Sequence, residues 1–426
     1  MESAHDELFE QYSEELIDAL YDESIRIALR RAVLSYKRNL AQALEKYPET
    51  RDLAKRVRLI KEASLKRLRS LIKETMEAIE DNGGVAYLAS SSEEAREIIG
   101  DIVGKGKVVV KGKSLTSEEI GLTEYLEELG NEVYETDLGE FLVQRMGIRP
   151  MHILSPAIHV PREKVAEVLS SIAGHRVKPE ISEEVKFVRK FLRDKFIKAD
   201  VGITGANVIS ADTGLIFLIE NEGNIRFVSN APPRHIVLAG VEKLVPTTLD
   251  AMMVSEVTWR YAGYNVPSYV SIIGGPSKTG DIEKTITYGA HGPKELHVVL
   301  LDNGRLRISQ DERFREALLC LRCGGCLYEC PVYRVVAGHF GDKYFGGIGA
   351  IWTAFIAGGL EKGMLLAYTC TLCERCKLHC PMEIDIPRMV LELRRLLVKR
   401  GLIPSPVKAI TENILKHGSP YFEMNS

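Results

Sequence analysis

The eight cysteines of this 426-residue chain form two runs with the same spacing, and a proline follows each run. Each run reads C-x2-C-x2-C-x3-C-P, the spacing of bacterial ferredoxin segments that hold cubane iron–sulfur clusters. The two runs therefore predict two [4Fe–4S] clusters. The cysteines are Cys320, Cys323, Cys326 and Cys330 in the first run and Cys370, Cys373, Cys376 and Cys380 in the second.

The spacing also predicts which cysteines share a cluster. Three thiolates separated by two residues each can reach three irons of one cube, whereas the fourth ligates the other cube. We therefore expect one cluster on Cys320, Cys323, Cys326 and Cys380, and the other on Cys370, Cys373, Cys376 and Cys330. The proline after each fourth cysteine turns the chain away, and Gly324 and Gly325 let the backbone approach the cluster closely.

Disulfides and structural zinc explain the runs less well. No signal peptide is evident at the start of the sequence, so we expect a cytoplasmic protein, in which a disulfide framework is not expected. Structural zinc usually takes paired C-x2-C units separated by a loop, rather than three evenly spaced cysteines and a fourth before proline.

The composition is that of an ordinary globular protein, with 45% hydrophobic and 27% charged residues. A net charge of −3 provides no field that would recruit nucleic acid, so no nucleic-acid partner is expected. The longest apolar stretch, around 348–357, is too short to cross a bilayer. We expect no transmembrane segment, and peripheral docking on a membrane through partners stays open.

Residues 1–82 are expected to be an N-terminal helical region. Apolar residues recur at three- and four-residue steps, with Pro48 separating a helix over 8–46 from the helix that follows it. Asp22 is a candidate break in the first helix, and the Asn82-Gly83-Gly84 sequence is expected to end the second.

Residues 83–302 alternate short apolar runs with helical stretches, which predicts an α/β domain with a mostly parallel sheet. The expected helices cover 92–103, 117–129, 162–173 and 182–196. The expected strands cover 85–89, 107–111, 132–137, 152–156, 215–220, 225–228, 235–238 and 296–301.

Residues 303–400 hold both cysteine runs. The spacer between the runs, 331–369, is too long and too helix-like for compact ferredoxin hairpins, and helices over 311–319 and 387–400 flank the runs. We therefore expect an α-helical ferredoxin domain, followed by a tail over 401–426 that is helical near 407–416.

Familiar motifs of nucleotide and hydrolase sites are missing from the sequence. The glycine-rich loops complete neither a P-loop nor a G-x-G-x-x-G fingerprint, and no G-x-S-x-G elbow occurs. No flavin or nucleotide site is therefore evident in this chain. The histidines of the α/β domain lack metal-binding spacing, and these residues alone do not identify a substrate.

Seven segments of the α/β domain nevertheless resemble the lactate-utilisation (LUD) domain, in the same order. Because they join directly to the double cysteine run, the chain resembles the lactate-utilisation protein B family, although its tail is shorter than that of many bacterial members. The segments are 111–119, 135–140, 156–159, 202–207, 221–224, 240–243 and 291–293.

The resemblance implies a LUD domain with the fold of the ribose-isomerase and CoA-transferase-like α/β proteins. It also implies an iron–sulfur electron-transfer subunit of an L-lactate oxidation complex that produces pyruvate, rather than a complete enzyme. The implied partners are a cysteine-rich redox protein and a second LUD protein, with a flavin carried by a partner. Which 2-hydroxy acid is oxidised does not follow from the sequence.

Polar residues in these segments are candidate ligand contacts of the LUD domain. Lysine and side-chain amides suit a carboxylate, while glutamate or histidine suits proton removal. The candidates are Lys113, Ser114, Glu118, Glu119, Asn207, Thr213, Glu222, Asn224 and His291.

Two other functions are compatible with the same motifs. In the first, the chain is a docking and electron-relay subunit of another redox complex, such as a heterodisulfide-reductase-like assembly. In the second, the LUD domain is an enzyme related to folate cyclo-ligases, which the lack of a nucleotide loop disfavours.

Overall fold

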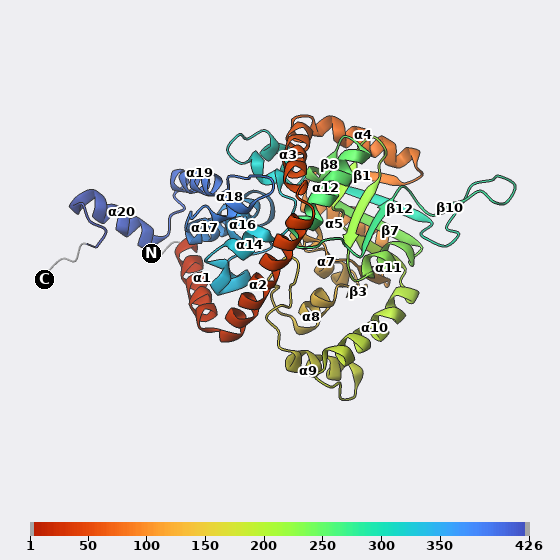
Figure 1. Ribbon diagram of the computed structural model, residues 1–426, viewed down its shortest axis with the longest axis horizontal. Coiled ribbons are helices and arrows are strands. Elements are labelled where there is room, and N and C mark those ends of the chain that lie inside the picture. Colours follow the sequence, from red (N-terminus) through yellow and green to blue (C-terminus); the bar gives the residue numbers. More distant parts are fainter. Residues whose placement is uncertain (1–3, 422–426) are drawn as a thin grey trace.

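A six-stranded parallel sheet forms the centre of the α/β region in the computed structural model, which describes residues 4–421 (Figure 1). Its strand order is β1-β12-β7-β4-β2-β3, and every adjacent pair is parallel. The strands are β1 (Val85–Ala89), β2 (Val108–Lys111), β3 (Glu132–Glu135), β4 (Val201–Thr204), β7 (Arg234–Gly240) and β12 (Glu295–Leu301).

Both faces of this sheet are covered, which explains its nearly continuous apolar strands. Alternate residues point to opposite faces: Val299 packs into one apolar cluster, whereas Val298 and Leu300 pack into another. The helices of this region are α5 (Ser92–Val103), α6 (Leu115–Glu119), α7 (Leu122–Glu128), α8 (Leu138–Met146), α9 (Arg162–Ala173), α10 (Ile181–Lys198), α11 (Asn224–Asn230) and α12 (Thr248–Tyr261).

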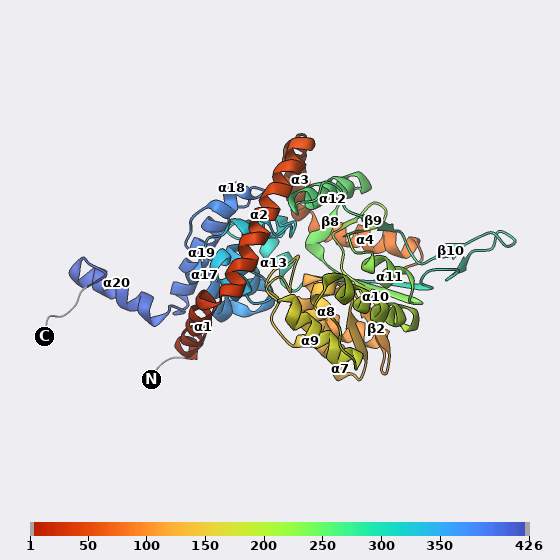
Figure 2. The same ribbon diagram turned by 60° about the horizontal axis from the view of Figure 1, so that its bottom comes forward.

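A smaller four-stranded sheet, in the order β8-β5-β6-β9, packs beside the parallel sheet. A short hairpin, β10 with β11, projects from the body at the end of the molecule opposite the C-terminal helix (Figures 1 and 2). The bounds are β5 (Val208–Ser210), β6 (Ile216–Glu220), β8 (Leu244–Val245), β9 (Tyr269–Ile273), β10 (Lys278–Thr279) and β11 (Thr287–Tyr288), with the 3-10 helix η1 (Val241–Lys243) between β7 and β8.

The N-terminal region forms four helices, and the expected break at Asp22 is present. The Asp22 carboxylate accepts hydrogen bonds from the backbone N–H groups of Ser24 and Ile25 and so caps the second helix. A further break, at Arg67, was not expected from the sequence. The helices are α1 (Ala4–Tyr21), α2 (Glu23–Lys46), α3 (Thr50–Lys66) and α4 (Leu68–Asp81).

The cysteine-rich region is built from short helices. Its elements are α13 (Arg305–Ser309), η2 (Arg315–Leu319), α14 (Gly325–Glu329), α15 (Tyr333–Val336), η3 (Ala337–His339), α16 (Gly346–Trp352), the π-helix η4 (Thr353–Ala357), α17 (Gly359–Thr369), α18 (Arg375–His379), α19 (Ile386–Lys399) and α20 (Ser405–His417). The last of these, α20, extends away from the body (Figure 1).

The N-terminal helices join the two halves of the molecule. One large apolar core contains residues of α1 to α4, of the small sheet and of the cysteine-rich region. The Tyr36 hydroxyl of α2 lies 2.9 Å from the Tyr261 carbonyl oxygen and 2.8 Å from His379 Nε2. Helix α2 thus contacts the α/β region and the second cysteine run through one side chain.

Several expected elements differ from the observed ones. Residues 152–156 form an irregular loop because tertiary contacts hold them, with His152 stacked on Tyr328 at a ring separation of 4.4 Å. Residues 225–228 lie in a helix because the Glu220 carboxylate caps its first N–H groups. The expected helix over 117–129 is two helices, divided at the left-handed Gly121.

Three further differences concern helices. The segment 311–319 contains only the 3-10 helix η2, and α8 and α12 were not expected from the sequence. Helix α12 has apolar side chains around most of its surface because it is buried among α2, α3 and the small sheet, so a one-sided stripe is absent.

A buried ion-pair network joins the parallel sheet to the cysteine-rich region. The Arg305 guanidinium, just after β12, donates to Glu119 Oε2 and to Glu242 Oε2 at 2.6 Å each, and all three side chains are inaccessible to solvent. Arg322, which lies in the first cysteine run, donates a hydrogen bond to Glu242 Oε1 at 2.8 Å. The Tyr344 hydroxyl donates to Glu119 Oε2 at 2.6 Å. We call these five residues the charge network.

Within residues 4–421, no helix is both long and apolar enough to span a membrane.

We predict that Arg305→Met lowers the free energy of unfolding by about 3–5 kcal/mol, because it leaves two buried carboxylates without their cation. Unfolding is followed by circular dichroism under anaerobic conditions. Arg162→Met is the matched control, since Arg162 forms an exposed pair with Glu163, and its effect is expected to stay within about 0.5 kcal/mol. Equal effects of the two changes would show that the charge network does not hold the halves together.

Candidate functional site

The two cysteine runs have the same local conformation although their side chains differ. The third residue of each run is left-handed, with φ +59° at Arg322 and +56° at Leu372. The fifth is left-handed as well, with φ +77° at Gly324 and +64° at Glu374. Successive turns of this kind direct backbone N–H groups toward an anion. Each loop is therefore shaped to surround a negatively charged group, and only the first run uses glycine for it.

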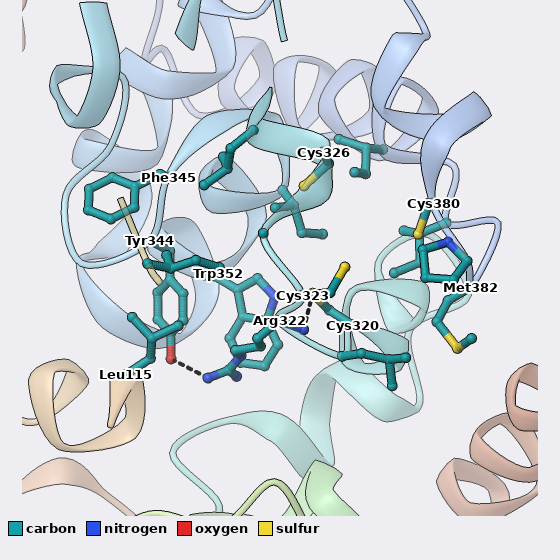
Figure 3. A pocket seen from close by; sticks show the side chains of 18 residues that line it. Leu115, Cys320, Arg322, Cys323, Cys326, Tyr344, Phe345, Trp352, Cys380 and Met382 are labelled. Atoms are coloured by element: carbon teal, nitrogen blue, oxygen red, sulfur yellow. Dashed lines mark hydrogen bonds between the residues drawn. The ribbon is translucent and has the colours of Figure 1, made fainter. Parts of the chain in front are cut away.

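Four cysteines from both runs line the first cysteine cavity (Figure 3). They are the first three cysteines of the first run and the last of the second: Cys320, Cys323, Cys326 and Cys380. The rest of the wall is largely apolar, and Trp352, Tyr344 and Arg322 lie together on one side of it. The backbone N–H of Arg322 donates to Cys320 Sγ at 3.4 Å.

The remaining cysteines line the second cysteine cavity, together with Cys326: Cys330, Cys370, Cys373 and Cys376. The two cavities share the wall formed by Cys326, Leu327, Ile348 and Ile386. Cys373 is exposed, so this cavity lies at the molecular surface.

The pKa values of these sulfurs fit ligation by cationic iron, in a cluster that is negative overall when its four thiolates are counted. Burial raises the pKa of Cys323 to about 12 and that of Cys380 to about 11, since a bare thiolate is poorly solvated there. Backbone N–H groups nevertheless approach the sulfurs, that of Gly325 at Cys323 and that of Ile384 at Cys380. Iron would stabilise the thiolates that burial disfavours, and the N–H groups would support the sulfur charge.

A single metal ion does not fit these cavities. In the part of the chain that the structure describes, no group of three or more His, Cys, Asp or Glu side chains is placed to hold one ion. Thiolates around a cube lie farther apart than those around one ion, because each of them binds a different iron. The arrangement therefore favours cubane clusters over structural zinc.

A third cavity, of about 290 Å³, opens where the parallel strands end. We call it the strand-end cavity. Lys113 follows β2, Asp137 follows β3, Asn207 follows β4 and Lys243 follows β7, and all four line it. Ligands of open α/β sheets bind outside the carboxyl ends of the strands. Leu321 and Arg322 of the first cysteine run complete the wall, so this cavity and the first cysteine cavity lie on either side of one loop.

The carboxylates of the strand-end cavity are held by backbone N–H groups. Glu220 accepts from Ile225 N and Arg226 N, and Asp137 accepts from Glu140 N. Glu222 accepts from Leu138 N at 3.3 Å. Burial and the nearby Asp137 carboxylate raise the pKa of Glu222 to about 7.

The cations of the same cavity have unused hydrogen-bonding capacity. Lys113 Nζ lies 3.4 Å from Glu140 Oε1 but forms no hydrogen bond, and Arg322 Nε is buried without a partner. Lys243 is 8% exposed, and its ammonium has no hydrogen bond or ion pair among residues 4–421. Burial and the neighbouring Arg322 guanidinium lower the pKa of Lys243 to about 7.

The structure brings together five of the nine candidate ligand residues and separates the other four. Lys113, Ser114, Asn207, Glu222 and Asn224 all line the strand-end cavity. Their distribution over 113–224 shows that the strand ends, rather than sequence proximity, assemble this site.

The other four candidates lie elsewhere. Glu119 is enclosed in the charge network, and His291 is exposed near the projecting hairpin. Thr213 forms hydrogen bonds with Ser210 and Thr248. Glu118 accepts from Lys111 at 3.0 Å at the edge of a separate acidic cavity of about 460 Å³.

Sequence reasoning missed Lys243 and Arg322 as cavity residues. Lys243 ends one of the segments that resemble the LUD domain, which was the available signal for its importance. No sequence motif marks Arg322. Only the folded loop shows that its guanidinium contacts Glu242 of the α/β region.

Comparison with known proteins gives two family matches and a set of close relatives. Residues 72–301 match the LUD domain, and residues 316–384 match the 4Fe-4S dicluster domain. "Lactate utilization protein B" of Bacillus licheniformis is 36% identical over 93% of this chain and 82% of its own length. The protein of that name from Bacillus thuringiensis (strain Al Hakam) is 35% identical over 92% of this chain and 81% of its own length.

A solved structure, that of a DUF162 family protein from Deinococcus radiodurans, is 16% identical to this chain with a TM-score of 0.32. It covers 55% of this chain and 98% of its own. At this level of similarity, the family assignment depends on the sequence matches.

The parallel α/β domain and the helical double-cysteine region thus coincide with the LUD and 4Fe-4S dicluster matches. The chain carries an iron–sulfur domain and belongs to the lactate utilisation protein B family.

Proposed function

We propose that this protein is the iron–sulfur electron-transfer subunit of a complex that oxidises L-lactate, or a related 2-hydroxy acid, to pyruvate or the corresponding 2-oxo acid. The observation that carries this proposal is the pair of cysteine cavities with a shared wall. Two redox centres divided by one layer of side chains are close enough to relay electrons.

The proposed ligand sets follow the lining of the cavities. The first [4Fe–4S] cluster takes Cys320, Cys323, Cys326 and Cys380, and the second takes Cys330, Cys370, Cys373 and Cys376. Cys326 lines both cavities, and we assign it to the first cluster because it is the third cysteine of its run. The exposed Cys373 makes the second cluster the one nearer to an electron-transfer partner.

The redox balance implies partner proteins. Oxidation of a 2-hydroxy acid to a 2-oxo acid releases two electrons and two protons, whereas a cubane cluster passes one electron at a time. A two-electron acceptor such as a flavin must stand between them, and we place it on a partner. We propose that the complex also contains a cysteine-rich redox protein and a second LUD protein.

The names of the relatives support the choice of substrate. "Lactate utilization protein B" describes proteins that share more than nine-tenths of this chain in alignment. We also propose a cytoplasmic location, because cysteines that serve as cluster ligands must stay reduced.

We predict that the double variant Cys320→Ala/Cys380→Ala keeps about half of the iron and sulfide, because both cysteines serve the same cluster. Cys320→Ala/Cys370→Ala is the matched control and loses nearly all of it, since it removes one ligand from each cluster. Iron and sulfide are assayed after anaerobic reconstitution, with EPR of the dithionite-reduced protein. Equal losses in the two double variants would contradict ligation across the runs.

We predict that L-lactate reduces the clusters when this protein is purified anaerobically together with its partners. Bleaching of the visible absorbance and the EPR signal of the reduced clusters measure the reduction, and D-lactate, glycolate and 2-hydroxybutyrate are compared. Purified protein without partners is the control and is expected to stay oxidised. If dithionite reduces the clusters but no hydroxy acid does, despite the full partner set, the clusters serve another electron donor and the lactate function is excluded.

A further inference from the structure

The strand-end cavity contains an unpaired buried cation, which is the feature that remains to be explained. Lys243 is 8% exposed and has no hydrogen bond or ion pair in the described residues. A buried charge without a partner is costly, and folded proteins usually pair it. The nearest acidic residue along the chain, Glu242, is already used by Arg305 and Arg322.

Two further cations, Lys113 and Arg322, line the same cavity. Each has a buried nitrogen atom without a hydrogen bond, Lys113 Nζ, which lies 3.4 Å from Glu140 Oε1, and Arg322 Nε. Cationic side chains from three separate segments of the chain therefore line one space of about 290 Å³. Three side-chain amides, those of Asn207, Asn221 and Asn224, lie in the same wall and can hydrogen-bond a polar ligand.

The charges that line the strand-end cavity indicate which class of anion fits it. The wall holds three cationic side chains, Lys113, Lys243 and Arg322, and three carboxyl groups, Asp137, Glu220 and Glu222. Because the pKa values of Lys243 and Glu222 are both about 7, one group of each sign is partly neutral near pH 7 and the balance is kept. A wall that is neutral overall favours a singly charged ligand over a phosphate, which carries more charge. Trp259, Ala262 and Leu218 provide an apolar side suited to a short carbon chain.

We propose that the strand-end cavity binds the carboxylate of a small 2-hydroxy or 2-oxo acid, with Lys243 and Arg322 as its main cationic contacts. This inference rests on the proposed function for the presence of the first cluster, but carboxylate binding itself is measured independently of electron transfer. The hydroxyl or oxo group of the acid would face Glu222 and the asparagine amides.

The position of the cavity couples binding of the acid to the redox state of the first cluster. Arg322 lies between two cluster cysteines, its backbone N–H donates to Cys320 Sγ, and its side chain lines the strand-end cavity. A carboxylate beside Arg322 would be repelled by the extra negative charge of a reduced cluster. By thermodynamic linkage, the bound acid must lower the reduction potential of the first cluster by an equivalent amount.

The experiment is isothermal titration of the anaerobic, cluster-loaded protein with L-lactate and with pyruvate, with inorganic phosphate and acetate as comparison ligands. We expect the Kd of the 2-hydroxy or 2-oxo acid to be at least about tenfold lower than that of either comparison ligand. Failure of both organic acids to bind to protein with intact clusters would overturn the inference and leave the electron-transfer function standing.

Lys243→Met tests the assigned cation. It should weaken binding of the acid by at least about tenfold while leaving the thermal midpoint unchanged or higher, because an apolar side chain replaces an unpaired buried charge. Lys243→Arg should restore most of the affinity, and Lys164→Met, on the exposed face of α9, should have no effect. Unchanged affinity in Lys243→Met would overturn the assignment, and a lower thermal midpoint would show that Lys243 has a structural role.

Titration of the acid into oxidised and into dithionite-reduced protein tests whether the acid binds beside the first cluster. We expect binding to weaken on the order of tenfold on reduction, which corresponds to a decrease of about 59 mV in the potential of a one-electron centre. Equal Kd values in the two states would place the acid away from the first cluster and overturn the site. Failure to assemble clusters at all would instead count against the proposed function, since carboxylate binding does not require electron transfer.

Discussion

The charge network is the interaction on which the arrangement of this molecule depends. Arg305 follows β12, Glu242 follows β7 and Glu119 lies in α6 after β2, so three strands contribute to it at their carboxyl ends. Arg322 extends the network into the first cysteine run. Because these charges are buried, each needs its partners at hydrogen-bond distance, and this requirement fixes the cysteine loop against the edge of the sheet.

That attachment makes three cavities adjacent to one another in series. The strand-end cavity shares the loop of Leu321 and Arg322 with the first cysteine cavity, which in turn shares a wall with the second. The second cysteine cavity reaches the surface at the exposed Cys373. A ligand bound at the strand ends would therefore lie at one end of the proposed electron path, and a redox partner could approach the other end.

The two cysteine runs show how one backbone conformation can be encoded by different side chains. The left-handed positions hold Arg322 and Gly324 in the first run and Leu372 and Glu374 in the second. A left-handed arginine, leucine or glutamate is strained relative to glycine. This strain is consistent with a loop whose shape is set by the group that it surrounds.

The sequence by itself determined the two equally spaced cysteine runs, the parallel α/β class and many helix positions, because these follow from residue spacing and local hydrophobic periodicity. It did not determine the course of 152–156 or 225–228, since contacts with Tyr328 and a cap from Glu220 override a short apolar run. Nor could it separate Glu119, a member of the charge network, from Lys113 and Asn207, which line the cavity. The pairing of a buried charge depends on strands that meet only in the folded sheet, so tertiary structure alone decided which motif residues are enclosed in the charge network and which line the strand-end cavity.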